Sequence, residues 1–484
     1  MKKFPPKAGA PIAHNLLPTY YLLLTTYYLL LPKHMYWTNF LHIYQPPAQK
    51  PYWIKRVAEE SYKKLMNGFL NDKDAKVTLN INACLTELLI KNKGKDILEK
   101  LKTLAARGQV EFTASAKYHP FLPLLPEAEI VRQIKLNEQT NKKIFGKLYQ
   151  PRGFFSPEMA YSKKIAKIAS KLGYLWVLAD ELAYNGKVNV MDHNLLYKIK
   201  GIKNLHVFFR ERDASFRILS AQIFSPKLLY AMLGARMHKT EYLLTAMDGE
   251  TFGHHRPGLE DMLFNLYADK KLKSVTISEL FELYNKVKMV EPLDSTWALM
   301  KKDLVRKTPF SRWHNPANPI HVKQWQLTYL AIKEFNKIGF KQKFYPKVRK
   351  MLDQAIHSDQ YWWASAQPWW SIEMIEGGAK ELMDTVLVIP SASKKAKEQA
   401  KKLYQEILYT SFAWQRSGKV DQLVKESDED VTQRIVKQQT FIPKKELERM
   451  IHQLKKQMQT AAKALEYERA AQIRNRIREL EEKL

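Results

Sequence analysis

Cysteine and glycine are scarce in this chain of 484 residues. Its single cysteine, Cys84, excludes an intrachain disulfide and a zinc site built from several cysteines. Glycine occurs 17 times and proline 23 times, which excludes collagen-like, elastic and broadly disordered proteins. A protein that does not depend on disulfides suits a reducing compartment, so we expect a cytoplasmic location.

Two phosphate-binding motifs are also absent. The chain contains neither G-x-G-x-x-G nor G-x-x-x-x-G-K-[ST]. Because these glycine patterns let the backbone approach a phosphate closely, their absence leaves a dinucleotide-binding or P-loop protein without support.

An apolar run long enough to span a bilayer is missing as well. The longest run, LLPTYYLLLTTYYLLL at 16–31, has 16 residues, whereas a spanning helix needs about 20. No A-x-A cleavage site follows it, so it is only loosely similar to a signal peptide. We expect that translation starts at Met35 and that 1–34 is an extension; an export or membrane segment is the alternative.

Charge of one sign dominates, with 79 basic against 49 acidic residues and a formal net charge of +30. Such an excess can indicate nucleic acid or an anionic membrane as partner. The lysines, however, are scattered along the chain rather than gathered with aromatics into one motif. We therefore interpret them as a solvated surface and expect neither nucleic acid nor membrane as a partner, unless 16–31 is an anchor.

Strand and helix patterns alternate from Met35 onward. Short apolar runs near 36–44, 77–81, 110–113, 153–156, 174–179 and 242–247 are separated by helical patterns. Repeated β–α units predict a parallel sheet, closed or doubly wound. After about residue 290 the pattern becomes helical, and a polar, acidic break follows near 426–430.

The last forty residues form a separate pattern. Apolar residues recur at spacings of four and three on both sides of Tyr467: Leu447, Ile451, Leu454, Met458, Ala461 and Leu465, then Ile473, Ile477, Leu480 and Leu484. The narrow stripe predicts a helical hairpin with a seam like that of a coiled coil. Because an isolated pair of this length is marginally stable, it should pack on a partner or on a second copy.

Two carboxylates occur where strands of a barrel would end. Glu158 follows a strand and a proline and precedes a helix, and Asp248 ends an apolar strand and is followed by Gly249. Catalytic groups of parallel barrels lie at this edge. Partial desolvation there raises a carboxyl pKa and suits an acid at neutral pH. One protonated and one ionised carboxyl is the pattern of glycoside cleavage.

Either carboxylate alone is better explained as a helix cap or a surface ion pair. Here, however, several unusual segments occur in order: HIYQPP at 42–47, GQVEF at 108–112, FFSPEMAYS at 154–162, DGETFGHH at 248–255 and SDQYWW at 358–363. Together they favour a functional site.

These five segments resemble those of glycoside hydrolase family 57, over roughly residues 35–390. The resemblance implies an α/β fold, namely an incomplete (β/α)7 barrel followed by a helical domain and, here, a C-terminal helical hairpin. The domains expected are a 1–34 extension, a 35–290 catalytic barrel, a 291–425 helical domain that completes the cleft, a 426–444 linker and a 445–484 hairpin.

The resemblance also implies a retaining double displacement on α-linked glucans. By position, Glu158 would be the nucleophile and Asp248 the general acid/base, with carboxyls about 5–5.5 Å apart. Substrate-binding residues would be His42, Gln45, Glu111, His119, Trp313, Asp359, Trp362 and Trp363. A packed helical core is the alternative for most of the tryptophans.

The same segments also contain residues that could bind a metal ion. His42, Asp248, His254 or His255 and Asp359 could supply nitrogen and oxygen ligands. Related zinc barrels use an H-x-D pair on the first strand, whereas Tyr44 stands at that position here. We therefore expect no metal and no other cofactor. His254 and His255 depart from the simplest form of the family motif and leave the reaction open.

The C-terminal hairpin resembles the UVR motif of UvrB and UvrC, most specifically at ALEYERAAQIRNRI. This implies a protein-interaction hairpin, through which 445–484 would bind a partner or a second copy. The leading hypothesis is thus a hydrolase or glucanotransferase acting on an α-glucan or oligosaccharide. The alternatives are a carbohydrate-binding scaffold without activity that uses the hairpin, and a nucleic-acid-associated repair factor.

Overall fold

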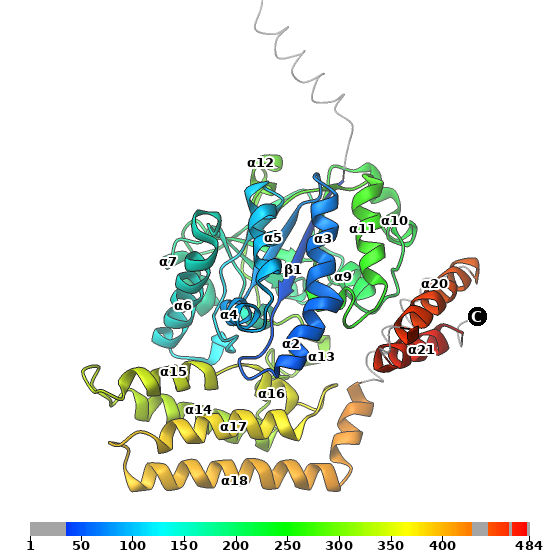
Figure 1. Cartoon of the computed structure of the whole chain (residues 1–484). Helices are drawn as coiled ribbons and strands as arrows, with labels where there is room; N and C mark the ends of the chain where they lie inside the picture. The colour runs from blue at the N-terminus through cyan, green and yellow to red at the C-terminus, as the bar shows by residue number, and fades with distance from the viewer. Residues whose placement is uncertain (1–34, 428–443, 464–466, 482–484) are drawn as a thin grey trace, which may run out of the picture.

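The structure, a computed structural model, describes residues 35–427, 444–463 and 467–481 (Figure 1). The expected extension 1–34 and nearly all of the expected linker 426–444 lie outside the described residues.

Strand β1 (Tyr36–Ile43) is the centre of a parallel sheet and is buried along almost its whole length. It lies between β2 (Val77–Ile81) and β8 (Tyr242–Asp248), and β2 pairs in turn with β3 (Val110–Phe112). The register places His42 opposite both Asn80 and Asp248. The carboxyl ends of these strands therefore bring polar side chains to one level of the sheet.

The parallel order continues through a single bridge between Ala114 and Phe154. Beyond it follow β4 (Gly153–Phe154), β5 (Trp176–Asp180) and β7 (His206–Arg210), all parallel. The seven strands β8-β1-β2-β3-β4-β5-β7 form the incomplete (β/α)7 barrel, so the expected fold class is confirmed. The smaller strands are β6 (Leu196–Ile199), β9 (Lys273–Ser274) and β10 (Val287–Val290).

Large side chains fill the inside of the barrel. Phe40, Phe155, Trp176, Phe208 and Tyr242 are almost fully buried in one cluster. A packed interior of this kind is a core and not a channel, so chemistry has to take place at the rim.

Amphipathic helices cover the outside of the barrel. In α5 (Lys95–Ala106), the buried residues Ile97, Leu98, Leu101 and Leu104 recur at helical spacing and face the strands. Ser162 caps α7 (Lys163–Lys171) by accepting a hydrogen bond from the Ile165 amide, as its position before the helix predicts. The remaining helices of this part are α2 (Pro51–Val57), α3 (Lys63–Asn71), α4 (Ala83–Lys91), α6 (Glu127–Phe145), α8 (Leu182–Asn185), α9 (Arg212–Leu219), α10 (Pro226–Leu233), α11 (Leu259–Asp269) and α12 (Leu280–Leu283).

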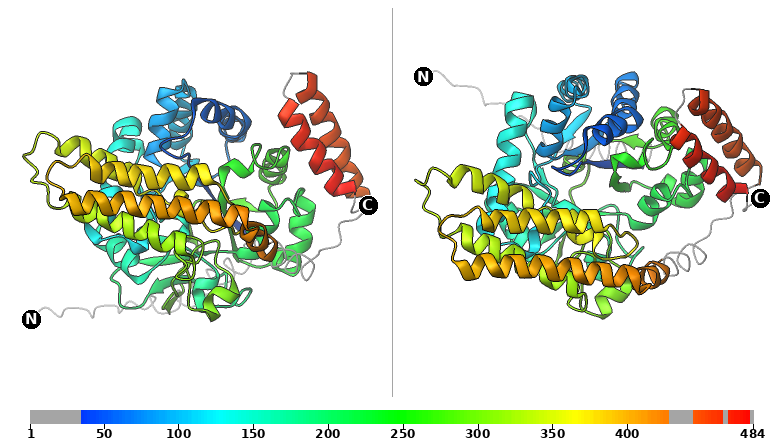
Figure 2. Two further views of the ribbon diagram at one scale, coloured as in Figure 1. Left: turned by 90° about the horizontal axis from the view of Figure 1, so that it is seen from below. Right: turned by 60° about the horizontal axis from the view of Figure 1, so that its bottom comes forward.

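A layer of helices lies across the carboxyl ends of the strands (Figures 1 and 2). It is tied to the barrel by a backbone bridge between Pro120 and His357, and by a buried ion pair in which Arg349 contacts Glu129 of α6 at 2.7 Å. The layer consists of α14 (Pro319–Phe335), α15 (Tyr345–Ala355), α16 (Asp359–Trp363), α17 (Ile372–Leu387) and α18 (Lys394–Arg416), preceded by the short α13 (Lys301–Val305).

Two C-terminal helices, α20 (Lys444–Lys463) and α21 (Tyr467–Glu481), form a hairpin beside α10 and α11 (Figure 2). The hairpin has its own apolar core, which includes Leu447, Ile451 and Ile473, and it meets the barrel at Phe224. Gln457 donates to Asp261 at 3.4 Å. Within the described ranges, no helix has the length and apolar character needed to cross a membrane.

Candidate active site

Glu158 lies in a tight turn after β4. The turn, η4 (Pro157–Met159), gives Glu158 a φ of 63° and Met159 a φ of 50°, in the left-handed region that residues other than glycine rarely adopt. Backbone strain of this kind costs about 1–3 kcal/mol per residue and persists where the surroundings impose it, often at functional sites. Here hydrogen bonds from two other segments of the chain hold the turn in this conformation.

Both carboxylate oxygens of Glu158 accept a hydrogen bond. Ser358 Oγ lies 3.0 Å from Oε1, and Trp297 Nε1 lies 3.1 Å from Oε2. The backbone amide of Trp297 also donates to the Glu158 carbonyl at 3.2 Å. Two donors aimed at one carboxylate favour its ionised form and fix its direction.

Burial nevertheless raises the pKa of Glu158 to about 8, and the charges of Asp359 and Asp248 act in the same direction. The hydrogen bonds from Ser358 and Trp297 oppose this shift. Glu158 therefore gives up its proton near pH 8 rather than near pH 4.

Asp248 is the last residue of β8 and stands beside His42 in the register. Burial raises its pKa to about 7, while the positive charge of Arg210 opposes the shift. Among the described residues, none donates a hydrogen bond to the Asp248 carboxylate. A desolvated carboxyl without donors favours its protonated form, which is what a general acid needs.

A third carboxyl, Glu250, lies next to Asp248 and interacts with it. Its Oε1 accepts a hydrogen bond from the Tyr44 amide at 3.1 Å and one from the Tyr62 hydroxyl. Burial raises the pKa of Glu250 to about 8, and the negative charge of Asp248 adds to the shift. Because the two groups titrate together, one proton is shared between them near neutral pH.

Asp359 begins α16 and faces the barrel from the helical layer. Its Oδ2 accepts from the Tyr44 hydroxyl at 2.7 Å and contacts His357 Nδ1 at 3.0 Å. Burial works against ionisation of Asp359, but the hydrogen bond and charge of His357 hold its pKa below the usual value. Asp359 therefore stays a carboxylate over the pH range in which Glu158 and Asp248 titrate.

An arginine pair holds the segment that carries Trp297. Arg210, at the end of β7, donates to Asp180 at 3.0 Å and to the Trp297 carbonyl at 2.9 Å. Arg212 donates to Asp180 at 2.7 Å and to the Leu299 carbonyl. The segment whose indole contacts Glu158 is thus held by residues at the end of β7.

The carboxyls of Glu158, Asp248, Glu250 and Asp359 form an acid cluster at the barrel mouth. Of the expected substrate-binding residues, His42 and His119 lie beside this cluster and Asp359 belongs to it. His119, which also has a left-handed φ of 55°, stacks on Tyr44 with ring centroids 4.0 Å apart. Gln45 lies at the edge, where its Nε2 donates to the Tyr62 hydroxyl at 3.4 Å.

The structure places Glu111 apart from His42, His119 and Asp359. Glu111 pairs with Thr78, and Thr78 pairs with Phe40, two residues before His42 on β1. In the register, Glu111 therefore stands two residues before the position of His42. Its carboxylate is bound there to Ser278 and Thr78, inside the barrel rather than at its mouth.

The expected stacking tryptophans divide into two groups. Trp313 has no exposed surface and packs between Phe121 and Trp362, which is the packed helical core named above as the alternative. Trp362 and Trp363 are partly buried. Trp363 has its ring 6.1 Å from that of Trp369, which is 55% exposed.

Several residues of the cluster were not anticipated from the sequence. Ser358, Glu250 and Tyr44 lie inside the quoted segments, so their neighbours could have indicated them. Arg210 could have been found from the sequence only if strand β7 had been recognised. Trp297 lies in a loop with no periodic or motif signal.

His254 and His255 do not reach the acid cluster. His254 Nδ1 contacts Glu60 at 2.6 Å, and burial lowers the pKa of His255 to about 4. Within the part of the chain that the structure describes, no group of three or more His, Cys, Asp or Glu side chains is arranged to hold a metal ion.

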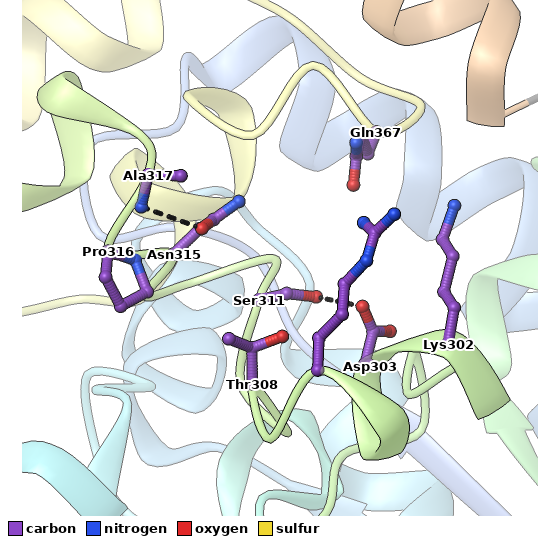
Figure 3. A pocket seen from close by; sticks show the side chains of 9 residues that line it. Lys302, Asp303, Thr308, Ser311, Asn315, Pro316, Ala317 and Gln367 are labelled. Atoms are coloured by element: carbon purple, nitrogen blue, oxygen red, sulfur yellow. Dashed lines mark hydrogen bonds between the residues drawn. The ribbon is translucent and has the colours of Figure 1, made fainter.

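A separate polar pocket follows Trp297 along the chain (Figure 3). Its cavity of about 370 Å³ lies between the 302–317 segment and Gln367. Asp303 lines the pocket and accepts hydrogen bonds from Ser311 Oγ at 3.0 Å and from the Met300 amide at 2.9 Å. The other lining residues are Lys302, Arg306, Thr308, Asn315, Pro316 and Ala317.

Comparison with known proteins gives two family matches. The model of glycosyl hydrolase family 57 matches residues 18–293, more than half of the chain. The model of the UvrB/uvrC motif matches residues 448–483, the C-terminal hairpin.

Individual relatives agree with the first match. The chain is 29% identical over 269 residues to alpha-amylase 1 of Dictyoglomus thermophilum, covering 54% of this chain but 38% of that protein. The chain thus spans well under half the length of that relative.

Solved structures show the same fold. A 4-alpha-glucanotransferase from Thermococcus litoralis gives a TM-score of 0.55 at 17% identity, over 72% of this chain and 58% of that one. A branching enzyme from Pyrococcus horikoshii gives a TM-score of 0.59 at 17% identity, over 78% of this chain and 94% of that one.

Proposed function

Because the chain belongs to glycosyl hydrolase family 57, we propose that it is a retaining glycoside hydrolase or transglycosylase acting on α-linked glucans. One observation carries the proposal. At the barrel mouth, the two oxygens of Glu158 are held by Trp297 and Ser358, and Asp248 is close enough for its charge to raise the pKa of Glu158. The names of the similar proteins, an alpha-amylase, a glucanotransferase and a branching enzyme, agree with this substrate class.

In the first step, Asp248 acts as the general acid. Its raised pKa, about 7, leaves the carboxyl partly protonated near neutral pH, and the protonated form passes its proton to the glycosidic oxygen as the bond to the anomeric carbon breaks. The carboxylate left behind faces Arg210, which stabilises the new charge.

Glu158 is the nucleophile of the same step. Its ionised carboxylate attacks the anomeric carbon and forms a glycosyl ester, while the leaving sugar departs with the proton from Asp248. In the second step, Asp248 removes a proton from water or from a sugar hydroxyl, and that oxygen displaces Glu158 from the anomeric carbon. Two inversions give net retention, which requires carboxyls about 5–5.5 Å apart.

Sugar contacts would come from both sides of the mouth. His42, His119 and Gln45 belong to the barrel side, and Asp359, Trp362 and Trp363 belong to the helical layer. Asp359 holds a negative charge there, which stabilises a transition state with positive character at the sugar ring.

The C-terminal hairpin is a second part of the proposal. Residues 445–484 would bind a protein partner or a second copy, separately from a catalytic unit made of the 35–290 barrel and the 291–425 helical domain. Its match to the UvrB/uvrC motif and its own apolar core support this division.

Incubation with one defined malto-oligosaccharide tests the activity. Shorter products alone indicate hydrolysis, a ladder of longer products indicates transfer, and new branch points indicate branching. The Glu158→Gln variant is the matched control, since it keeps the size of the side chain and removes the charge. If the wild-type chain binds the glucan but forms no product, the alternative of a carbohydrate-binding scaffold is correct.

A further inference from the structure

A line of hydrogen bonds runs from Glu158 into the wall of the barrel. Ser358 Oγ lies 3.0 Å from Glu158 Oε1 and 2.9 Å from His119 Nδ1. The other nitrogen of that ring, His119 Nε2, lies 3.1 Å from His42 Nε2. One carboxyl, one hydroxyl and two imidazoles are therefore in series.

The line continues into two neighbouring strands. His42 Nδ1 lies 2.7 Å from Asn80 Oδ1, and Asn80 Nδ2 donates to Thr113 Oγ1 at 3.1 Å. These side chains are fully or almost fully buried, so bulk water cannot replace a lost partner.

The number of protons limits how this line can be arranged. A hydroxyl and a neutral imidazole each carry one mobile proton, so Ser358 donates either to Glu158 or to His119. Burial lowers the pKa of His119 to about 4 and that of His42 well below its usual value, so both rings are neutral near pH 7. Each bond must then point the same way along the line.

Two arrangements satisfy every group. In the inward one, protonated Glu158 donates to Ser358, Ser358 donates to His119 Nδ1, His119 Nε2 donates to His42 Nε2, and His42 Nδ1 donates to Asn80 Oδ1. In the outward one, Ser358 donates to ionised Glu158 and every other bond reverses. Asn80 then turns its amide nitrogen to His42 and accepts from the Thr113 hydroxyl.

We propose that Ser358 couples the ionisation of Glu158 to a joint tautomer exchange of His119 and His42. Between the inward and the outward arrangement the line loses one proton, which passes to bulk solvent. His119 carries its proton on Nε2 in the inward arrangement and on Nδ1 in the outward one, whereas His42 carries its proton on Nδ1 in the inward arrangement and on Nε2 in the outward one. Each ring keeps one proton, so no buried imidazole becomes charged. Only the catalytic consequence rests on the proposed function of Glu158.

The exchange gives the nucleophile a suitable partner in both states. Ionised Glu158 receives a donor from Ser358, and protonated Glu158 finds an acceptor there. The charged groups that face the line are Asp359 and His357 from the helical layer and Asp248 from β8. The net effect is that Ser358 and the two rings act as positioning residues for Glu158.

Nitrogen NMR of the full-length protein with ¹⁵N-labelled histidine tests the coupling directly, because ring ¹⁵N shifts distinguish the two tautomers. We expect His119 and His42 to exchange tautomer in opposite senses with one shared midpoint between about pH 5 and pH 9, both remaining neutral. His119→Gln and His42→Gln assign the signals.

Ser358→Ala removes the link without removing a titrating group. We expect the tautomer exchange to disappear and the acid limb of the pH–rate profile to move up by at least about half a pH unit, since Glu158 loses a donor. Ser358→Thr keeps the hydroxyl and should restore both. Ser411→Ala, a buried serine on α18 that bonds its own helix, is the matched control.

Fixed tautomers across that pH range, or an exchange that survives Ser358→Ala, would overturn the proposal. Absence of glucan turnover in the wild-type protein would bear on the proposed function and not on the coupling. A wild-type protein without turnover that still shows a Ser358-dependent exchange would contradict the proposed function and support the coupling.

Discussion

Glu158 and Asp248 obtain different environments from neighbouring residues. Glu158 has two donors on its oxygens, whereas Asp248 has the charge of Arg210 and, among the described residues, no donor. Donors favour an ionised carboxylate, and desolvation without donors favours a protonated one. The hydrogen bonds thus favour an ionised nucleophile and a protonated acid, as retaining chemistry needs, whereas burial leaves the pKa of Glu158, about 8, above that of Asp248, about 7.

The pH–rate profile should be bell-shaped with its optimum near neutral pH. Activity requires Glu158 ionised, so it is lost as the pH falls, and it requires Asp248 protonated, so it is lost as the pH rises. Burial raises both pKa values, that of Glu158 to about 8 and that of Asp248 to about 7, so both limbs of the profile lie near neutral pH. Initial rates measured from pH 4 to pH 10 check this. An optimum near pH 4, where free carboxyls titrate, would contradict it.

Asp248→Asn should separate stability from activity. The folded pKa of about 7 exceeds the unfolded value of 3.8, so the buried carboxyl favours folding below pH 3.8 and loses that contribution as the pH rises through 7. A neutral amide should therefore raise the free energy of unfolding by on the order of 2 kcal/mol at pH 8 and by little at pH 4.

Denaturant unfolding at the two pH values measures the difference. The same variant should lose about 10³-fold or more in kcat while glucan binding persists. Equal stability of the two proteins at pH 8 would show that Asp248 is not the buried carboxyl described here.

At the scale of elements, the site depends on a close contact between α17 and α16. A Cβ at Gly378 would lie 2.4 Å from the Gln360 Cβ, whereas a Cβ at the adjacent Gly377 would meet nothing within 4 Å. Gln360 directly follows Asp359, so the position of α17 sets the position of a residue in the acid cluster.

Adjacent alanine substitutions in α17 should therefore act in opposite directions. Gly378→Ala should lower the free energy of unfolding by about 1–3 kcal/mol through overpacking and reduce kcat by displacing α16. Gly377→Ala should raise the free energy of unfolding by about 0.5–1 kcal/mol, because alanine is the better helix former. Thermal unfolding and kinetics of both variants provide the comparison. Equal effects of the two substitutions on stability and kcat would contradict a close contact between α16 and α17 at Gly378.

Strand patterns predicted most of the barrel, but not all of it. The apolar runs of β1, β2, β5 and β8 are visible in the sequence, and Glu158 and Asp248 follow from the ends of such strands. The short β6 and β7 lie in a lysine-rich stretch and were missed, and Arg210 with them. Register, which depends on pairing and not on local pattern, placed Glu111 below the mouth.

At the scale of the whole molecule, the site is assembled from segments far apart in the chain. Trp297 reaches Glu158 across 139 positions, and Ser358 reaches it across 200. No local sequence pattern predicts contacts between residues so far apart in the chain. The high aromatic content of the sequence does not distinguish buried from exposed tryptophans either. Trp313 is fully buried, whereas Trp369 is 55% exposed.

Removal of the hairpin should leave the catalytic unit intact. Its apolar core comes mainly from α20 and α21, and its contacts with the barrel among the described residues include Phe224 and the Gln457–Asp261 hydrogen bond. Deletion of 440–484 should therefore keep kcat/KM within about twofold and change the oligomeric state or partner binding. Light scattering and kinetics measure both. Loss of folding on deletion would make the hairpin part of the core instead.

The covalent intermediate is the most direct test of the account. Asp248→Asn incubated with an α-glucosyl fluoride, whose leaving group needs no acid, should accumulate a glycosyl ester because the second step lacks its base. Intact-protein and peptide mass spectrometry should place one added glucosyl group on Glu158. An adduct on another residue, or turnover of the fluoride with inverted products and no adduct in any variant, would contradict Glu158 as the nucleophile.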